Sequence, residues 1–570
     1  MKRITIFFAL CAVCVCVAAK ETLPQWAQEL LKQNTGVIDS IKVVPLESQY
    51  LYDYFDDPEE AVQTRTYIIY YNQPVRHSNP TGAHFPLRAT LTVFNDADIT
   101  TAVNHVNCGG YALDSVWVSE PDAQFAYYSV NNSINEIAHR YHANYLYPEF
   151  RYFSFSAPER CYENLDDLRS EEAAEDFHNL FVALKKVMKG KWVMSGSSKG
   201  GTTTLLQHAF HPEDMDAYVP YAAPFFDTDC DTVMQKYWFN NGWTQEYLDL
   251  FMDIRRKALT RKDQIFPLYE KITKTYYPNE STDKLYGRYL ISVGHLGFNE
   301  HAYQDTATLR KSKEYNEELF EDYGIEPYND TVVAVIMINT KFRIESFGYW
   351  RDFLRTGKAP APPLHKSSDR AGYLPFGVTA EQWWANNENG YTGQAYEYQA
   401  RTELGYYDLR LDEISGPETG AAWNAQYRQY VGSLRDFDLE QYHSCIFNRS
   451  VYDRAVTTTQ NAQKPIIFIY GADDTWTGAA MRDTYINGTN VRKFILPAQN
   501  HTVSFSANSD KAQCDAIRAM LDEVLLGTPQ GIEEVSQQPS SVRVEKVLRN
   551  GQLLIRRGDT EYTVTGQRVR

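Results

Sequence analysis

The sequence predicts an α/β fold with a mainly parallel sheet, interrupted by one large and mainly helical insertion. Two observations predict the sheet. The chain contains short apolar runs, which are typical of strands, and these runs alternate with stretches in which apolar residues have helical spacing. A strand, a helix and a second strand in this order form a parallel βαβ unit. The third observation predicts the insertion, because strand patterns become sparse after Phe225 and resume at residues 465–470.

The first 19 of the 570 residues have the features of a signal peptide. Lys2 and Arg3 form a basic start, residues 4–17 are an apolar run too short to span a bilayer comfortably, and Ala19 ends a small-residue cleavage site. We therefore expect export to the periplasm, the cell surface or the medium, with a lipid anchor as the open alternative. No later stretch predicts a stable membrane span. The net charge of −17 argues against nucleic acid as a partner.

The first part of the predicted core alternates strands with helices. Its strand-like runs are rich in β-branched, aromatic and other apolar residues and occur at 66–71, 88–94, 101–107, 142–150, 192–194 and 217–221. Its helical runs occur at 171–189 and 202–210. Gly190 follows a basic last turn, which predicts that the first helix ends there.

The remainder is predicted from the same patterns. Within the insertion, residues 331–337 resemble a strand, and helix-like stretches dominate the rest. A strand at 491–496 and a helix at 512–526 complete the core, and the dipeptide Asn550-Gly551 predicts a hairpin in the tail. The expected parts are a signal peptide (1–19), the first part of the core (20–225), a mainly helical cap (226–455), the second part of the core (456–527), a linker (528–541) and a small β tail (542–570).

Residues 196–200 (Gly-Ser-Ser-Lys-Gly) lie between a predicted strand and a predicted helix. The pattern G-x-S-x-G in this context is typical of a nucleophile elbow, in which glycines allow a sharp turn and the serine is held at the carboxyl edge of the sheet. The first backbone amides of the following helix then point toward the serine, where they can stabilise negative charge. The pattern predicts that Ser198 is a nucleophile and that the fold is that of an α/β-hydrolase, with the insertion as its cap.

Such a serine needs an acid and a base, in the order Ser, Asp, His. Asp474 follows the predicted strand at 465–470, and His501 follows the strand at 491–496. We choose Asp474 over the adjacent Asp473, since one of two neighbouring Asp residues is more often a turn or cap residue. His501 would take the serine proton as general base, and Asp474 would orient the imidazole.

Negative charge that develops on the substrate would be stabilised by backbone amides. The amide of Lys199 is one candidate, and those of Gly110 and Tyr111 belong to a glycine-containing loop at the end of another strand. The predicted reaction is acyl transfer to water. It requires no cofactor and no metal, and the sequence has no metal-binding or phosphate-binding motif that would suggest one.

Four segments together resemble exported serine exopeptidases of the prolyl-carboxypeptidase and tripeptidyl-aminopeptidase group. They cover the elbow, the segment Glu-Phe-Arg-Tyr-Phe, the cap segment Tyr-Gln-Ala-Arg-Thr-Glu-Leu-Gly-Tyr-Tyr and the acid loop Gly-Ala-Asp-Asp-Thr-Trp, at 196–201, 149–153, 398–407 and 471–476. Departures from the group's pattern stand at Phe150, Arg401 and Thr475, where it has His, Cys and Pro. The absence of this His and this Cys favours the bacterial tripeptidyl aminopeptidases.

The resemblance implies a peptidase that releases short peptides, tripeptides above all, from free N-termini, often with a proline preference. It makes Glu403, Glu149 and Trp476 candidates for substrate binding, the two carboxylates as partners of the substrate's ammonium group. A structural ion pair of Glu149 with Arg151 or another base is the alternative. An esterase of the same fold, a prolyl-type carboxypeptidase and a non-catalytic binding protein also remain open, as does the oligomeric state.

Overall fold

The structure is a computed structural model that describes most of the predicted core, part of the insertion and the strands of the tail. The described residues are 23–44, 49–52, 61–95, 97–113, 116–118, 126–128, 135–153, 156–158, 165–228, 233–234, 236–237, 245–274, 278, 280–295, 328–338, 395–396, 398–405, 447–486, 490–506, 510–527, 544–549, 552–557 and 560–563. The predicted signal peptide and the linker at 528–541 lie outside these residues. Cys108 and Cys514 are buried free thiols.

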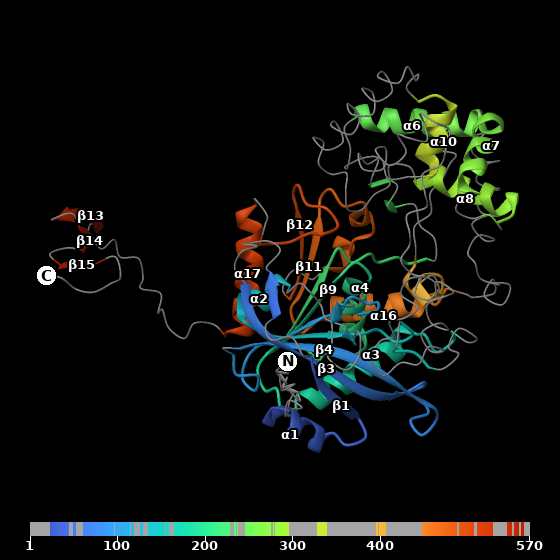
Figure 1. Ribbon diagram of the computed structural model, residues 1–570. Helices are drawn as coiled ribbons and strands as arrows, with labels where there is room; N and C mark the ends of the chain where they lie inside the picture. Colours follow the sequence, from blue (N-terminus) through green and yellow to red (C-terminus); the bar gives the residue numbers. More distant parts are fainter. Residues whose placement is uncertain are drawn as a thin grey trace, which may run out of the picture. The chain divides into compact units, whose positions relative to one another are not determined.

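A ten-stranded sheet forms the centre of the core (Figure 1). Its strands run in the order β1-β3-β4-β8-β5-β9-β10-β11-β12, and β2 pairs with β3. Their bounds are β1 (Ile38–Val43), β2 (Gln49–Tyr52), β3 (Ala61–Pro74), β4 (His84–Phe94), β5 (Asn104–Asn107), β8 (Asn144–Pro148), β9 (Trp192–Ser197), β10 (Ala217–Tyr221), β11 (Ile466–Gly471) and β12 (Val491–Leu496). The short strands β6 (Val116–Val118) and β7 (Ala126–Tyr128) form a separate hairpin.

The sheet is antiparallel at its first edge and parallel from β8 onward. The ladder is antiparallel from β1 through β3 and β4 to β8, and it is parallel through β5, β9, β10, β11 and β12. Parallel neighbours end at the same edge, so the segments that follow β9, β11 and β12 emerge together. This topology, with the elbow described below, is that of an α/β-hydrolase, and it confirms the predicted fold class.

Helices connect the strands as the alternating pattern predicts. Around the sheet lie α1 (Gln25–Gln33), α2 (Glu136–Tyr141), α3 (Ser170–Leu184), α4 (Lys199–Phe210), α16 (Arg449–Gln460) and α17 (Lys511–Leu525). Figure 1 shows α3, α4 and α16 on one side of the strands and α2 with the start of α17 on the other. A parallel sheet covered on both faces explains why β9, β10 and β11 are almost continuously apolar and buried.

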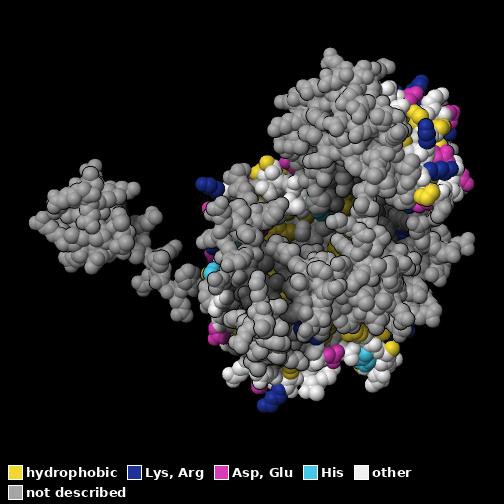
Figure 2. All heavy atoms as spheres, viewed as in Figure 1, with side chains coloured by type: hydrophobic (Ala, Val, Ile, Leu, Met, Phe, Trp, Pro, Cys, Tyr) yellow, Lys and Arg dark blue, Asp and Glu magenta, His cyan; other side chains and the backbone are white. Residues whose placement is uncertain are grey.

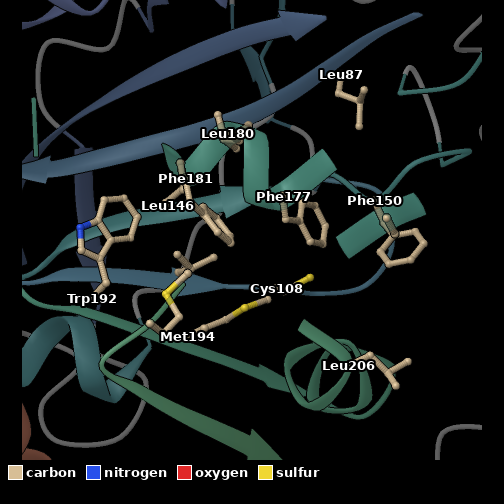
Figure 3. Close-up of a cluster of buried hydrophobic side chains, with 14 of the residues drawn as sticks. Leu87, Cys108, Leu146, Phe150, Phe177, Leu180, Phe181, Trp192, Met194 and Leu206 are labelled. Atoms are coloured by element: carbon tan, nitrogen blue, oxygen red, sulfur yellow. The ribbon is translucent and has the colours of Figure 1, made fainter. Parts of the chain in front are cut away.

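The main hydrophobic core lies between the sheet and the helices (Figure 3). Phe177 and Phe181 of α3 face Leu146 of β8 and Met194 of β9, and all four side chains are at most 1% exposed. Their spacing of four residues places both rings on one face of α3. The helical periodicity of this segment thus determines how α3 packs on the sheet.

The insertion separates β10 from β11, which are neighbours in the sheet. Its described helices are α6 (Gln245–Thr260), α7 (Lys262–Thr273), α8 (Thr282–His295), α10 (Asp330–Ile338) and the π-helical turn η3 (Ala400–Leu404). The first four share a hydrophobic cluster of their own. Charged side chains of both signs are interspersed over α7 and α8 (Figure 2).

The strand predicted at 331–337 is wrong, because these residues form α10. Its buried residues run without interruption from Val332 to Met337. A short run that is apolar on all sides has neither the two-residue nor the 3.6-residue period, so its pattern alone cannot separate a buried helix from a buried strand.

The tail belongs to a second unit, residues 522–570. Its strands β13 (Val544–Arg549), β14 (Gln552–Arg557) and β15 (Thr560–Thr563) form a three-stranded antiparallel ribbon, in agreement with the predicted β tail. The register pairs Arg549 with Gln552. The predicted hairpin dipeptide Asn550-Gly551 lies outside the described residues. Among the helices that the structure describes, none is both long enough and apolar enough to cross a bilayer.

Candidate active site

Ser198 stands in a strained conformation between β9 and α4. Its φ is 57° and its ψ is −125°, a region that residues with a side chain rarely occupy. Its amide donates to the carbonyl of Tyr221 at the end of β10 (3.0 Å), and its own carbonyl accepts from Thr202 (3.0 Å). These bonds hold the turn and leave Ser198 partly exposed at the carboxyl edge of the sheet.

The glycines of the elbow are required by close backbone approach. A Cβ atom on Gly196 or Gly200 would collide with the carbonyl oxygen of Cys108, which belongs to the segment after β5. A Cβ atom on Gly201 would collide with the carbonyl of Tyr221. The G-x-S-x-G-G pattern therefore allows β9 and α4 to pack against both neighbouring strand ends.

Asp474 and His501 meet at this same edge. His501 Nδ1 lies 2.8 Å from Asp474 Oδ2, and the two residues are 4% and 0% exposed. Their loops are joined by backbone bonds from Ala472 to the carbonyl of Leu496 (2.9 Å) and from Asp473 to the carbonyl of Gln499 (2.9 Å). The imidazole thus donates to a buried carboxylate, which fixes the tautomer with the lone pair on Nε2.

The second oxygen of Asp474 is also engaged. Asp474 Oδ1 accepts from the amide of Trp476 (3.0 Å) and so caps the short helix η5 (Thr475–Ala479). Asp473 is partly exposed, and burial raises the pKa of its carboxyl. The structure thus gives the histidine contact to the Asp residue that the sequence favoured.

Trp476 is 5% exposed and lies beside the histidine. Its ring centroid is 5.9 Å from that of His501 and 6.4 Å from that of Phe226. This position makes Trp476 a packing support for the imidazole, with little surface available to a ligand.

The loop after β5 contacts the start of α4. Gly110 has a φ of 73°, and a Cβ atom placed on it would lie 3.1 Å from the amide nitrogen of Gly200. The Tyr111 carbonyl accepts from the amide of Phe150 (3.0 Å). The three predicted oxyanion residues, Lys199, Gly110 and Tyr111, are therefore gathered around the elbow.

The side chain of Lys199 is a buried cation that sequence reasoning did not single out. Its Nζ donates to the carbonyl of Gly110, lies 3.6 Å from the ring centre of Phe150, and faces Tyr111 (5.2 Å) and Phe153 (5.0 Å). Burial lowers the pKa of this ammonium group to about 7. Lys199 thus ties the start of α4 to the loop after β5.

Glu149 has no solvent exposure and is occupied by structural partners. Its two oxygens accept from Arg88 Nε and Nη2 (both 2.7 Å), the Leu113 amide (2.9 Å) and Ser156 Oγ (2.8 Å). This geometry is the ion pair that the sequence left open as an alternative, with Arg88 as the base. Arg151 instead pairs with Asp176, at 2.6 and 2.9 Å.

Glu403 comes from η3 and is 7% exposed. Its Oε2 accepts from the amide of Ser170, the first residue of α3 (2.7 Å), where the helix dipole favours a carboxylate. Burial raises the pKa of this carboxyl. A cavity of about 10 Å³, room for about one water molecule, lies beside it and is lined in part by Ser170, Lys199 and Gln399.

A further buried carboxylate near the site is Glu136 of α2. It accepts from Ser504 Oγ (2.6 Å), the amides of Phe505 (3.2 Å) and Ser506 (2.7 Å), and Tyr221 Oη (2.9 Å). It therefore ties the loop after His501 to the end of β10. Sequence reasoning missed Glu136, since no local pattern distinguishes it from the other acidic residues at helix starts.

A comparison with known families gives a match that covers the elbow. Residues 57–282 match the family PS-10 peptidase S37, a range that includes Ser198 and ends before Asp474. A curated relative, prolyl tri/tetrapeptidyl aminopeptidase of Streptomyces mobaraensis, is 29% identical over 281 residues. These matches confirm the predicted resemblance to serine peptidases of the bacterial tripeptidyl aminopeptidase family. The alignment covers 48% of this chain and 54% of the relative, so the chain spans about half of that protein's length.

Solved structures with partial likeness are also hydrolases. Feruloyl esterase B from Aspergillus oryzae is 13% identical, with a TM-score of 0.32, over 95% of this chain and 97% of the esterase. The peroxisomal α/β-hydrolase Lpx1 from Saccharomyces cerevisiae is 9% identical, with a TM-score of 0.31, over 83% of this chain and 92% of that protein. Such low scores carry no argument about function, and the fold assignment depends on the sheet order and elbow of this chain.

Proposed function

We propose that this chain is an exported serine peptidase that releases short peptides, tripeptides above all, from free N-termini. The observation that carries the proposal is the buried bond from His501 to Asp474 at the sheet edge where the strained Ser198 stands. The related S37 family and the aminopeptidase of Streptomyces mobaraensis favour a peptide bond as the target. A proline preference is carried over from the name of that relative.

In the proposed mechanism, Ser198 Oγ attacks the scissile carbonyl and His501 Nε2 takes its proton. His501 then gives the proton to the leaving amine, and water repeats the sequence to release the acyl group. Asp474 stabilises the imidazolium that forms in both steps. The amides of Lys199 and of the loop that contains Tyr111 stabilise the oxyanion.

Recognition of a free N-terminus needs an anion, and Glu403 is the remaining candidate. Glu149 is enclosed by Arg88, Leu113 and Ser156, so it offers no oxygen to a substrate. Glu403 uses Oε2 for the Ser170 amide, and we assign Oε1 to the substrate's ammonium group.

A substrate panel with two variants tests the proposal. The panel contains chromogenic tripeptides with free and with blocked N-termini, and a small ester. Wild-type protein should cleave the free tripeptides, and Ser198→Ala should lose the activity. Cleavage of the ester alone would instead favour an esterase, and equal behaviour of wild type and Ser198→Ala on every substrate would leave a binding protein.

The Glu403→Gln variant tests the anchor separately. We expect a higher KM for free tripeptides and an unchanged rate on the small ester. Equal losses on both substrates would assign Glu403 to the capping of α3 and not to substrate binding.

A further inference from the structure

A cluster of imidazole and carboxylate groups lies at the end of the sheet opposite to Ser198. His178 and Glu175 belong to α3, His211 follows the last residue of α4, and Asp214 precedes β10. Because α4 has twelve residues and begins next to Ser198, the cluster lies about 18 Å along that helix from the elbow. None of these residues has a part in the proposed reaction.

The side chains of the cluster converge. His178 Nδ1 lies 2.8 Å from Asp214 Oδ1, and His211 Nε2 lies 3.0 Å from Glu175 Oε1. The two imidazole rings are stacked with their centroids 4.2 Å apart. One ligand atom from each of His178, His211 and Asp214 lies within 4.8 Å of the others.

We propose that His178, His211 and Asp214 bind one divalent transition-metal ion of the zinc class. Two imidazoles with one carboxylate suit Zn²⁺ and its neighbours, whereas Ca²⁺ and Mg²⁺ prefer oxygen ligands. In a tetrahedral zinc site the ligand atoms lie roughly 3.3 Å apart, so small side-chain movements complete the site. The two histidine side chains are 34% and 17% exposed, which leaves them room to turn.

The groups behind the cluster hold the carboxylate in place. Asp214 Oδ2 accepts from Gln207 Nε2 (2.7 Å), a residue that is 1% exposed, while the carbonyl of Asp214 accepts from Lys185. Oδ1 is thereby directed to the side of the histidines. Metal sites commonly have such outer hydrogen bonds, which orient the ligands.

The charges of the cluster also favour a cation. Asp214 and Glu175 supply two negative charges against the one positive charge of Lys185, so the groups around two neutral imidazoles carry a net negative charge. The ion would join α3, the end of α4 and the start of β10, so its expected role is structural. This proposal does not depend on the peptidase activity.

Metal binding is tested on full-length protein without a histidine tag, after treatment with a chelator. Titration with Zn²⁺ by calorimetry, and with Co²⁺ by visible absorption, should give one ion per chain. His178→Gln and Asp214→Asn should each weaken Zn²⁺ binding at least tenfold. The control His84→Gln changes an exposed histidine that bonds the carbonyl of Gly82, and it should bind as wild type does.

Two results would overturn the proposal: wild-type protein that binds no Zn²⁺, or His178→Gln protein that binds it with wild-type affinity. Circular dichroism of each variant shows that the fold is kept. A variant that is unfolded is replaced by His211→Gln, for which the same tenfold loss is expected and wild-type affinity contradicts the site. Ser198→Ala should bind the ion normally, so failure of the peptidase proposal and failure of this one are distinguishable.

Discussion

Lys199 follows the candidate nucleophile in the chain, and its ammonium group lies 3.6 Å from the centre of the Phe150 ring. Both side chains are 2% exposed. Phe150 is a position where the resemblance expects His, and an aromatic ring without charge offers a buried cation its negative face. Phe150, where the family pattern has His, therefore provides the ring that contacts the buried ammonium group of Lys199.

Lys199→Met should impair catalysis more than substrate binding. The substitution keeps the backbone amide but removes the bond that holds the Gly110 carbonyl beside the elbow. Loss of a direct oxyanion donor costs about 10²–10³ in kcat, and for this indirect effect we expect a loss of about tenfold to 100-fold, with little change in KM. Steady-state kinetics on a free tripeptide measures both values. Lys189→Met, at an exposed lysine, is the control, and a selective rise in KM would contradict the positioning role.

The same substitution should change how stability depends on pH. Burial lowers the pKa of Lys199 to about 7 in the folded chain, whereas an unfolded chain keeps this proton to about pH 10.4. Between these two pKa values the unfolded state binds more protons than the folded state. The contribution of Lys199 to the free energy of unfolding therefore rises with pH, by up to about 1.4 kcal/mol per pH unit. Below pH 7 both states hold the proton, and this contribution is flat.

Urea unfolding of wild type and Lys199→Met at pH 6, 7.5 and 9 measures this effect. The wild type should gain stability relative to the variant from pH 7.5 to pH 9, since Met cannot titrate. At pH 6 the variant should be as stable as wild type or more so, because an apolar side chain replaces a buried charge. A constant difference across the three pH values would show that Lys199 does not titrate in this range.

The parts of the site that lie directly after strands could be predicted from the sequence. Ser198, Asp474 and His501 each follow an apolar run, and parallel pairing brings the ends of such runs to one edge. The local rules for elbow glycines and strand ends therefore carried most of the information. This explains why the bond between Asp474 and His501 was expected although 26 residues separate them.

Partners that depend on distant packing could not be predicted. Glu136 contacts Ser504, 368 positions away in the chain, and Glu149 contacts Arg88 across two neighbouring strands. A carboxylate in a sequence looks the same whether its oxygens face water, a substrate or a buried base. Its role is set by which side chains the fold places around it, and no periodic pattern records this.

Asp474→Asn should reduce kcat by about 10³–10⁴ and leave the protein folded. The amide can present its nitrogen to His501 Nδ1, which favours the wrong tautomer, and a comparable change in other serine peptidases costs about 10⁴. Single-turnover kinetics on an ester substrate measures the acylation rate. Asp473→Asn, at the next residue towards the N-terminus, whose carboxyl is partly exposed, is the matched control. Equal losses in the two variants would contradict the assignment of the acid.

Glu149→Gln should destabilise the protein without selecting between substrates. Breaking a buried ion pair by changing one partner costs about 3–5 kcal/mol, because the other charge stays buried. Arg88 would be that charge. Asp253→Asn is the control, since it breaks an exposed pair with Arg256 and should cost at most about 1 kcal/mol. Thermal and urea unfolding measure the loss. A stable variant with a raised KM for free N-termini alone would instead restore Glu149 to substrate binding.

Glu136→Gln should slow the reaction by displacing the loop that follows His501. Each oxygen of Glu136 accepts from Ser504, Phe505 or Ser506. The side-chain amide of Gln would place an NH₂ group, which cannot accept, opposite some of these donors. A misplacement of about 1 Å can cost on the order of 10²-fold in rate, so we expect a loss in kcat of about tenfold to 100-fold with KM nearly unchanged. Tyr221→Phe removes one bond to the same carboxylate and should have a smaller effect. If Glu136→Gln lowers stability while kcat stays at the wild-type value, Glu136 supports the fold and does not position His501.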